Sequence, residues 1–156
     1  MNAKELLILN FEETRRRSIM VWKQISEEQL HWRPDPGAMS CLEMIRHVLE
    51  SEIFYHHIIL HRGKLGDFES PLKGHPFTNV EDELRYAQPY RERFLKFINS
   101  FSMKDLDEIY ITRPEKKQHR KLGDYVLRCA YHESVHTGQM LDYLRTLKAH
   151  RAAIWD

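Results

Sequence analysis

The sequence predicts an all-α protein, a four-helix bundle with long crossover connections. Apolar residues recur at steps of three and four in four separate stretches, as on the buried side of amphipathic helices. No stretch shows a strand pattern of consequence, and segments rich in proline and glycine separate the four. Two connections, residues 64–79 and 102–121, are long, as in bundles with crossover topology.

The first helix is expected to cover the N-terminal part of the chain and to end near Ser26. A loop with Trp32, Pro34, Pro36 and Gly37 follows it, and proline before glycine excludes a continued helix. Trp32 and Pro34 are expected to pack this loop against the bundle. The buried stripe of the first helix consists of Leu7, Phe11, Thr14, Ser18, Val21 and Ile25.

The second helix begins after Ser40, a favourable N-cap residue, and Glu43 three positions later completes a capping box. We expect it to run to about Arg62, because the following Gly63 ends it. Its main buried stripe consists of Cys41, Ile45, Val48, Glu52, Tyr55 and Ile59.

The third helix is expected at about residues 80–101. Residues 102–121 are polar, with Pro114 near their middle, and a short extended piece is expected at Ile109–Thr112. The last helix should run from Leu122 to Leu147. The third stripe consists of Val80, Leu84, Ala87, Arg91, Phe94, Ile98 and Phe101, and the last of Leu122, Val126, Cys129, Glu133, His136, Met140, Tyr143 and Leu147.

The chain is expected to form a single domain over residues 1–156, long enough to bury a core without disulfides. Lysine and arginine number 24 against 23 acidic residues, so no field of one sign is available for nucleic acid or a membrane surface. Arg15, Arg16 and Arg17 are interpreted as one solvated cluster on the first helix.

Localisation follows from three features of the sequence. The first ten residues contain Lys4, Glu5 and only a short apolar run, which argues against a signal peptide. No window reaches the apolar length of a membrane span. Cys41 and Cys129 are too far apart to indicate a disulfide framework or a zinc ribbon. We therefore expect a soluble cytoplasmic protein.

Two histidines, His132 and His136, lie one turn apart in the last helix. Residues four apart project from the same face of a helix, so both imidazoles can reach one metal ion. The same spacing occurs at His57 and His61, in the last turn of the second helix, where polar side chains interact with the free carbonyls. We interpret that second pair as surface residues.

His47 is a third candidate ligand, because it lies on a second stripe of the second helix and faces packed surface. Three inward-facing histidines on two helices predict a metal site, since bundle cores build such sites from facing helices. Three neutral imidazoles fit zinc, nickel or iron and leave positions open for water or substrate. The alternative is a group of core histidines satisfied by hydrogen bonds. The second stripe also contains Met44, Ser51, Phe54 and Ile58.

Charged residues within apolar stripes require partners, because an unpaired buried charge is costly. We predict that Arg91 pairs with Glu133 or Glu52; the alternative is that it anchors the carboxylate of an anionic thiol. Cys129 lies one turn before His132 and is a candidate fourth ligand, although the preferred interpretation is a small core residue.

Three segments carry a family resemblance: residues 30–34 (LHWRP), residues 41–48 (CLEMIRHV) and residues 132–139 (HESVHTGQ). In these segments the chain resembles the DinB superfamily. The resemblance implies a DinB-like four-helix bundle of unusual connectivity, in which the same three histidines hold a divalent metal. It also implies a homodimer. The activities it suggests are transfer of a low-molecular-weight thiol such as bacillithiol, thiol-dependent isomerisation, and metal-dependent hydrolysis.

A metal at the three histidines would polarise the group in its open position. The metal would lower the pKa of bound water to about 7, and a bound thiol would lose its proton. Glu50, one turn beyond His47, is a candidate base or hydrogen-bond acceptor; a solvated carboxylate is the alternative. Gln139, one turn beyond His136, is a candidate to orient that imidazole or to contact substrate. Plain packing is the alternative for Gln139, and equally for Tyr143.

Two hypotheses follow. The first is a metal-dependent enzyme, a thiol S-transferase or a hydrolase, that acts on a small molecule. The second is a non-catalytic metal-binding or stress-associated bundle protein. An open metal position beside a pocket would favour the first hypothesis. A fourth protein ligand, or histidines bonded to one another without a metal, would favour the second. The balanced charge argues against nucleic-acid binding.

Overall fold

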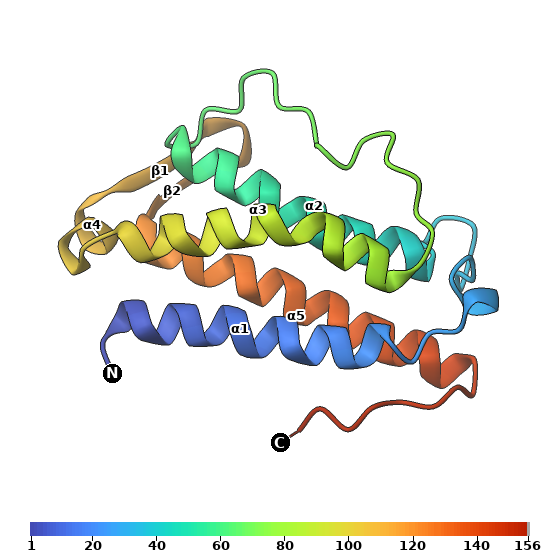
Figure 1. Cartoon of the computed structure of the whole chain (residues 1–156). Helices are drawn as coiled ribbons and strands as arrows, with labels where there is room; N and C mark the ends of the chain where they lie inside the picture. Colours follow the sequence, from blue (N-terminus) through green and yellow to red (C-terminus); the bar gives the residue numbers. More distant parts are fainter. Residues whose placement is uncertain (156) are drawn as a thin grey trace.

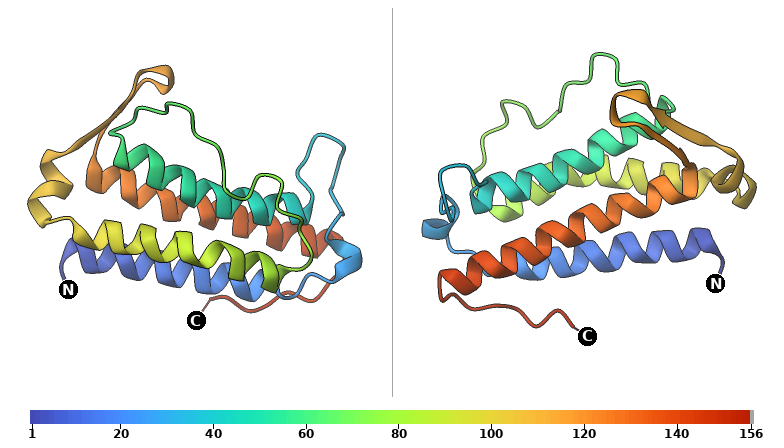
Figure 2. Two further views of the ribbon diagram at one scale, coloured as in Figure 1. Left: turned by 45° about the horizontal axis from the view of Figure 1, so that its top comes forward. Right: turned by 180° about the vertical axis from the view of Figure 1, so that it is seen from behind.

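The computed structural model describes residues 1–155, and in this range four long helices form a bundle (Figure 1). Helices α1 and α5 run in one direction, and α2 and α3 run in the opposite one (Figure 2). The connection from α2 to α3 therefore crosses the length of the bundle. The expected four-helix bundle is confirmed, but only one of the two long connections crosses it: residues 101–121 join α3 to α5 at the same end of the bundle. The four helices are α1 (Ala3–Trp22), α2 (Cys41–Leu60), α3 (Val80–Ser100) and α5 (Leu122–Thr146).

The expected boundaries hold for three of these helices to within two residues, but the expectation that the first helix reaches Ser26 is wrong. Helix α1 ends at Trp22, where the chain tightens: the N–H groups of Gln24 and Ile25 donate to carbonyls only three residues back. Ile25, the last residue of the predicted stripe, is still buried, although it lies in a turn and not in the helix. Ser26 then precedes a short 3-10 helix, η1 (Glu27–Gln29).

Residues 102–121 fold more regularly than the sequence suggests. The expected extended piece is present as β1 (Tyr110–Arg113), which pairs antiparallel with β2 (Gln118–Lys121) through the turn η2 (Pro114–Lys116). A short helix, α4 (Met103–Glu108), precedes the hairpin. The sequence analysis did not anticipate α4 or β2, because α4 is too short to show a helical period and β2 contains no apolar residue.

The core of the bundle is divided along its length. One apolar cluster surrounds Trp22 and Met44, and a second surrounds Phe11 and Phe94. Between them lies a layer of buried polar and charged side chains, to which each long helix contributes; its members are Thr14, Arg15, Ser18, Glu52, Arg91, Glu133 and Thr137. In the part of the chain that the structure describes, no helix combines the length and apolar character of a membrane span.

Gly63 joins the hairpin to the end of α2. Arg62 and Gly63 have positive φ angles of 55° and 98°, which terminates the helix as the sequence predicts. The backbone N–H of Thr112 donates to the carbonyl of Arg62. A Cβ at position 63 would lie 2.0 Å from the carbonyl oxygen of Thr112, so only glycine allows this approach.

We predict that Gly63→Ala lowers the free energy of unfolding by about 3 kcal/mol in urea denaturation. Left-handed alanine costs roughly 1–2 kcal/mol, and the clash with β1 adds an overpacking cost of similar size. The matched control is Gly66→Ala, which has a φ of +52° but meets no atom within 4 Å and should show the strain alone. Equal losses in the two variants would contradict the close approach.

Candidate metal centre

The three predicted histidines meet between two helices. His47 projects from α2, and His132 and His136 project from α5. The Nε2 atom of His132 lies 3.2 Å from Nε2 of His47 and 3.2 Å from Nε2 of His136. All three ligand atoms lie within 4.8 Å of one another. The nitrogens of a tetrahedral ion bound at about 2.0–2.1 Å are about 3.3–3.4 Å apart, so this spacing fits such an ion.

Gln139 determines which nitrogen of His136 is available. Its amide oxygen Oε1 lies 2.7 Å from Nδ1 of His136. An amide oxygen only accepts, so Nδ1 must donate its hydrogen and Nε2 retains its lone pair. That lone pair is directed toward the other two rings. The contact is of the kind that orients a metal-bound imidazole.

The environment of the cluster favours neutral imidazoles. Burial, followed by the charge that His136 and His47 would carry, lowers the pKa of His132 to about 4. Burial and His136 also lower the pKa of His47, while the nearby Glu50 carboxylate opposes the shift. Neutral imidazole is the form that binds metal, so these two ligands need no deprotonation at neutral pH.

The cluster lies at the edge of the core. The sequence analysis placed His136 in the middle of a buried stripe, but all three histidines are half-buried, and Thr137 and Met140 occupy the inward side of α5 there. The bundle therefore covers the cluster only in part. Among the described residues, the candidate ligand group contains no fourth member.

The other candidates near the site have different partners. Cys129 is buried, and its thiol donates toward the carbonyl of Tyr125 at 3.5 Å, as expected of a core residue. Glu50 accepts a hydrogen bond at 2.7 Å from the hydroxyl of Ser70, in the connection between α2 and α3. The Tyr143 hydroxyl donates to the carbonyl of Met39 at 3.1 Å, which is a packing role.

Two further predictions concern the ends of α2: that Trp32 packs its loop against the bundle, and that His57 and His61 lie on the surface. Trp32 packs edge-on against Tyr143, so the loop lies against the bundle as expected. His61 is exposed, and its Nδ1 donates to the carbonyl of His57. His57 is half-buried instead of superficial, because its Nε2 donates to the carbonyl of Leu65 at 2.6 Å.

Buried ion pairs lie directly behind the histidines. Arg91 donates to Glu52 at 2.5 Å and to the carbonyl of Phe11 at 2.9 Å, which confirms one of its two predicted acidic partners. The interpretation of Arg15 as solvated is wrong: it is 5% exposed and donates twice to Glu133, at 2.7 and 3.0 Å. Burial opposes the charge of Glu133, yet Arg15 holds the pKa of Glu133 below its usual value. Its stripe position, four residues after Phe11, was the signal for burial.

A groove of about 350 Å³ borders the cluster at His132. The sequence analysis did not identify it, because its walls come from α2, the hairpin and α5, and only the fold brings these together. The Tyr55 ring packs edge-on against His132, with ring centroids 5.7 Å apart. The groove is also lined by Arg113, Gln118, Tyr125, Arg128, Tyr131 and Val135.

Comparison with known proteins identifies the family of the chain. A family model described as the DinB superfamily matches residues 10–140. The chain belongs to the DinB superfamily. A comparison with curated proteins gave no match.

Two solved structures from Bacillus subtilis share the DinB-like fold. YjoA, a DinB-like protein, is 18% identical with a TM-score of 0.70, over 95% of each chain. YfiT is described as a probable metal-dependent hydrolase with an unusual four-helix bundle topology. It is 13% identical with a TM-score of 0.74, over 93% of this chain and 87% of YfiT. At these identities the likeness shows the fold alone.

We predict that Arg15→Ala lowers the free energy of unfolding by about 3–5 kcal/mol, because it leaves Glu133 buried without its bidentate partner. Urea denaturation followed by circular dichroism measures the change. The control is Lys104→Ala, which breaks an exposed pair with Glu108 and should cost less than about 1 kcal/mol. A loss below 1 kcal/mol in Arg15→Ala would rule out a stabilising role for the buried pair.

We predict that His132 of the metal-free protein titrates near pH 4 by NMR. Because its pKa is lower folded than unfolded, the unfolded chain binds more protons between pH 6.5 and 4. The contribution of neutral His132 to the free energy of unfolding is therefore complete above pH 6.5 and is lost as the pH falls toward 4. In His47→Ala the pKa of His132 should rise, since one neighbouring imidazole is gone. Titration near 6.5 in the parent protein would contradict the burial.

Proposed function

We propose that this DinB-superfamily protein is a divalent-metal-dependent enzyme that acts on a small molecule. The observation that supports this proposal most directly is the position of His132 Nε2, which lies 3.2 Å from Nε2 of both His47 and His136, with all three ligand atoms within 4.8 Å. A single hydrogen on Nε2 of His132 can point at only one of its two neighbours, so hydrogen bonding alone leaves one contact unsatisfied. A shared cation satisfies all three lone pairs together.

Hydrolysis is the reaction we favour. His47, His132 and His136 would hold a divalent ion, zinc, nickel or iron, which would supply a nucleophile from water near neutral pH. Gln139 would keep His136 in the tautomer that binds. Glu50 would serve as the base, because its charge already acts on His47 and its Oε1 atom is held by Ser70. The description of YfiT as a probable metal-dependent hydrolase supports this choice.

Thiol S-transfer is the second candidate, with bacillithiol or a similar low-molecular-weight thiol as the attacking group. A transferase must hold two small molecules at once. The groove of about 350 Å³ beside His132 favours it, because that volume lies within the range of small-ligand sites.

We predict close to one equivalent of metal per chain in tag-free protein, measured by inductively coupled plasma mass spectrometry. The His132→Ala/His136→Ala variant should retain almost none. The matched control is His57→Ala/His61→Ala, which removes the same spacing from α2 and should leave the metal content unchanged. No metal in the parent after anaerobic reconstitution would overturn the enzyme proposal and favour a non-catalytic bundle.

Activity separates the two reactions once metal is established. Hydrolysis of ester and amide probes should require metal and proceed without thiol. Thiol transfer should require metal together with bacillithiol and an electrophile. In either case Glu50→Gln should lower kcat while leaving the metal content intact.

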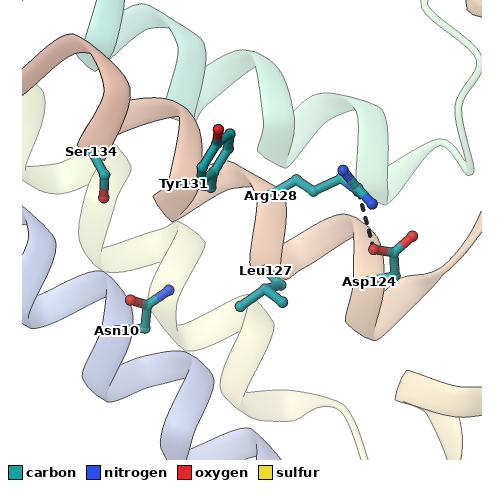
Figure 3. Close-up of a pocket in the computed structure, with 6 residues that line it drawn as sticks. All are labelled: Asn10, Asp124, Leu127, Arg128, Tyr131 and Ser134. Atoms are coloured by element: carbon teal, nitrogen blue, oxygen red, sulfur yellow. Dashed lines mark hydrogen bonds and ion pairs between the residues drawn. The ribbon is translucent and has the colours of Figure 1, made fainter. Parts of the chain in front are cut away.

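We also propose a cytoplasmic homodimer. Both cysteines are buried free thiols, which fits a reducing compartment. On α5, Leu127, Tyr131 and Val135 are large exposed residues at steps of four. Figure 3 shows Leu127 and Tyr131 with Asn10 of α1, lining a hollow of about 500 Å³ between the helices. The part of this surface at Asn10 and Leu127, which does not line the groove beside His132, is our candidate for the dimer contact.

We predict a dimer mass in size-exclusion chromatography with multi-angle light scattering. Leu127→Glu should yield a monomer, because it places a charge in the apolar contact. Leu60→Glu changes an equally exposed leucine on α2 and should remain dimeric. A monomeric parent protein would disprove the dimer.

A further inference from the structure

The groove beside His132 has walls that suit an anion. Its polar groups are guanidinium groups, phenols and a side-chain amide, and none of the residues that line it is a carboxylate. It reaches the candidate metal centre at His132. A molecule that occupies the groove can therefore place one end at the histidines and the other among these donors.

Arg113 is the main cation of this wall. Residues of a strand alternate between faces, and Arg113 shares the inward face of β1 with the fully buried Ile111. Its side chain is 10% exposed, and its Nε donates to Glu115 at 2.8 Å. Glu115 is much more exposed, so water screens that partner while the guanidinium remains at the groove. The Phe54 ring packs against the guanidinium with 5.8 Å to the ring centroid.

The hairpin adds a local positive field that the balanced whole-chain charge conceals. Six cations lie on the hairpin and the first turns of α5, and three carboxylates pair with members of this group. Arg128 belongs to it and stands at the ridge between the groove and the hollow of Figure 3, where it pairs with Asp124. The cations are Arg113, Lys116, Lys117, Arg120, Lys121 and Arg128, and the carboxylates are Asp107, Glu115 and Asp124.

Two other buried arginines differ from Arg113. Arg15 and Arg91 are also buried, but each donates to a buried carboxylate and neither lines this groove. Arg113 differs because its acidic partner, Glu115, is exposed and because Arg113 itself lines the groove. Arginine in such a position binds planar or tetrahedral oxyanions through two parallel hydrogen bonds.

We propose that the groove binds the anionic end of the substrate, a carboxylate or a phosphate group, with Arg113 as the specificity-determining residue and Arg128 in support. The placement of the reacting end at the histidines rests on the proposed metal-dependent function. The binding of the anion itself does not, because neither Arg113 nor Arg128 is one of the proposed metal ligands. The two can therefore fail separately.

The test uses the full-length, metal-loaded protein and two probes, succinate and inorganic phosphate, titrated at constant ionic strength against chloride. We expect saturable shifts of the arginine Nε–H resonance of Arg113 and the side-chain amide of Gln118 in NMR spectra. A tighter response to one probe identifies the class of anionic group. Shifts that do not saturate, or that chloride reproduces, overturn the proposal.

Variants assign the site. Arg113→Gln should weaken binding of the preferred probe about ten-fold, equivalent to about 1.4 kcal/mol, with the backbone amide spectrum confirming the fold. Arg128→Gln changes an exposed side chain that the fold does not need, and should weaken binding about three-fold. Arg93→Gln, on α3 and away from the groove, is the matched control and should bind like the parent. Unchanged binding in both Arg113→Gln and Arg128→Gln overturns the proposal.

The His132→Ala/His136→Ala variant separates anion binding from the metal. Saturable shifts of the Arg113 resonance that persist in this variant support the proposal, even if metal binding fails. Shifts that disappear with the histidines show that the probes bound the metal, and this outcome overturns the proposal.

Discussion

Each of the four long helices contributes a charged side chain to the middle of the bundle. Glu52 of α2 lies between Arg91 of α3 and Arg15 of α1, and Arg15 also binds Glu133 of α5. Ser18 and Thr137 extend the layer by a hydrogen bond of 2.7 Å. An ion pair of this kind stabilises only when both charges meet in good geometry, because desolvation is costly. The rotation and axial position of every helix are therefore restricted at one level.

The histidine cluster depends on that restriction. Glu133 directly follows His132, and successive residues of a helix point about 100° apart. When Glu133 points inward to Arg15, His132 must point toward α2, where His47 lies. Glu52 positions α2 in the same way, five residues beyond His47. The geometry of the histidine cluster thus depends on Glu52 and Glu133, which orient α2 and α5 without contacting the histidines themselves.

Much of this could be predicted from local pattern. The apolar stripes defined the four helices, and the spacing of His132 and His136 with the second stripe of α2 indicated the cluster. Arg15 was misinterpreted because three consecutive arginines resemble a solvated run, although its step from Phe11 places it in the stripe. The groove could not be predicted from the sequence, for a different reason. Arg113 comes close to His132 only through the hairpin, whose second strand has no apolar residue and whose docking depends on backbone contact at Gly63.

The order of elements along the chain also determines when the site can form during synthesis. His47 leaves the ribosome long before His132, from which it is separated by 85 residues. Until α5 emerges, Arg15 lacks Glu133, and the apolar side of α1 lacks the helix that covers it. Before then Arg15 has only Glu52 of α2 as an acidic partner. We therefore expect a chain truncated within α5 to lose the Arg15–Glu133 pair and the histidine cluster together.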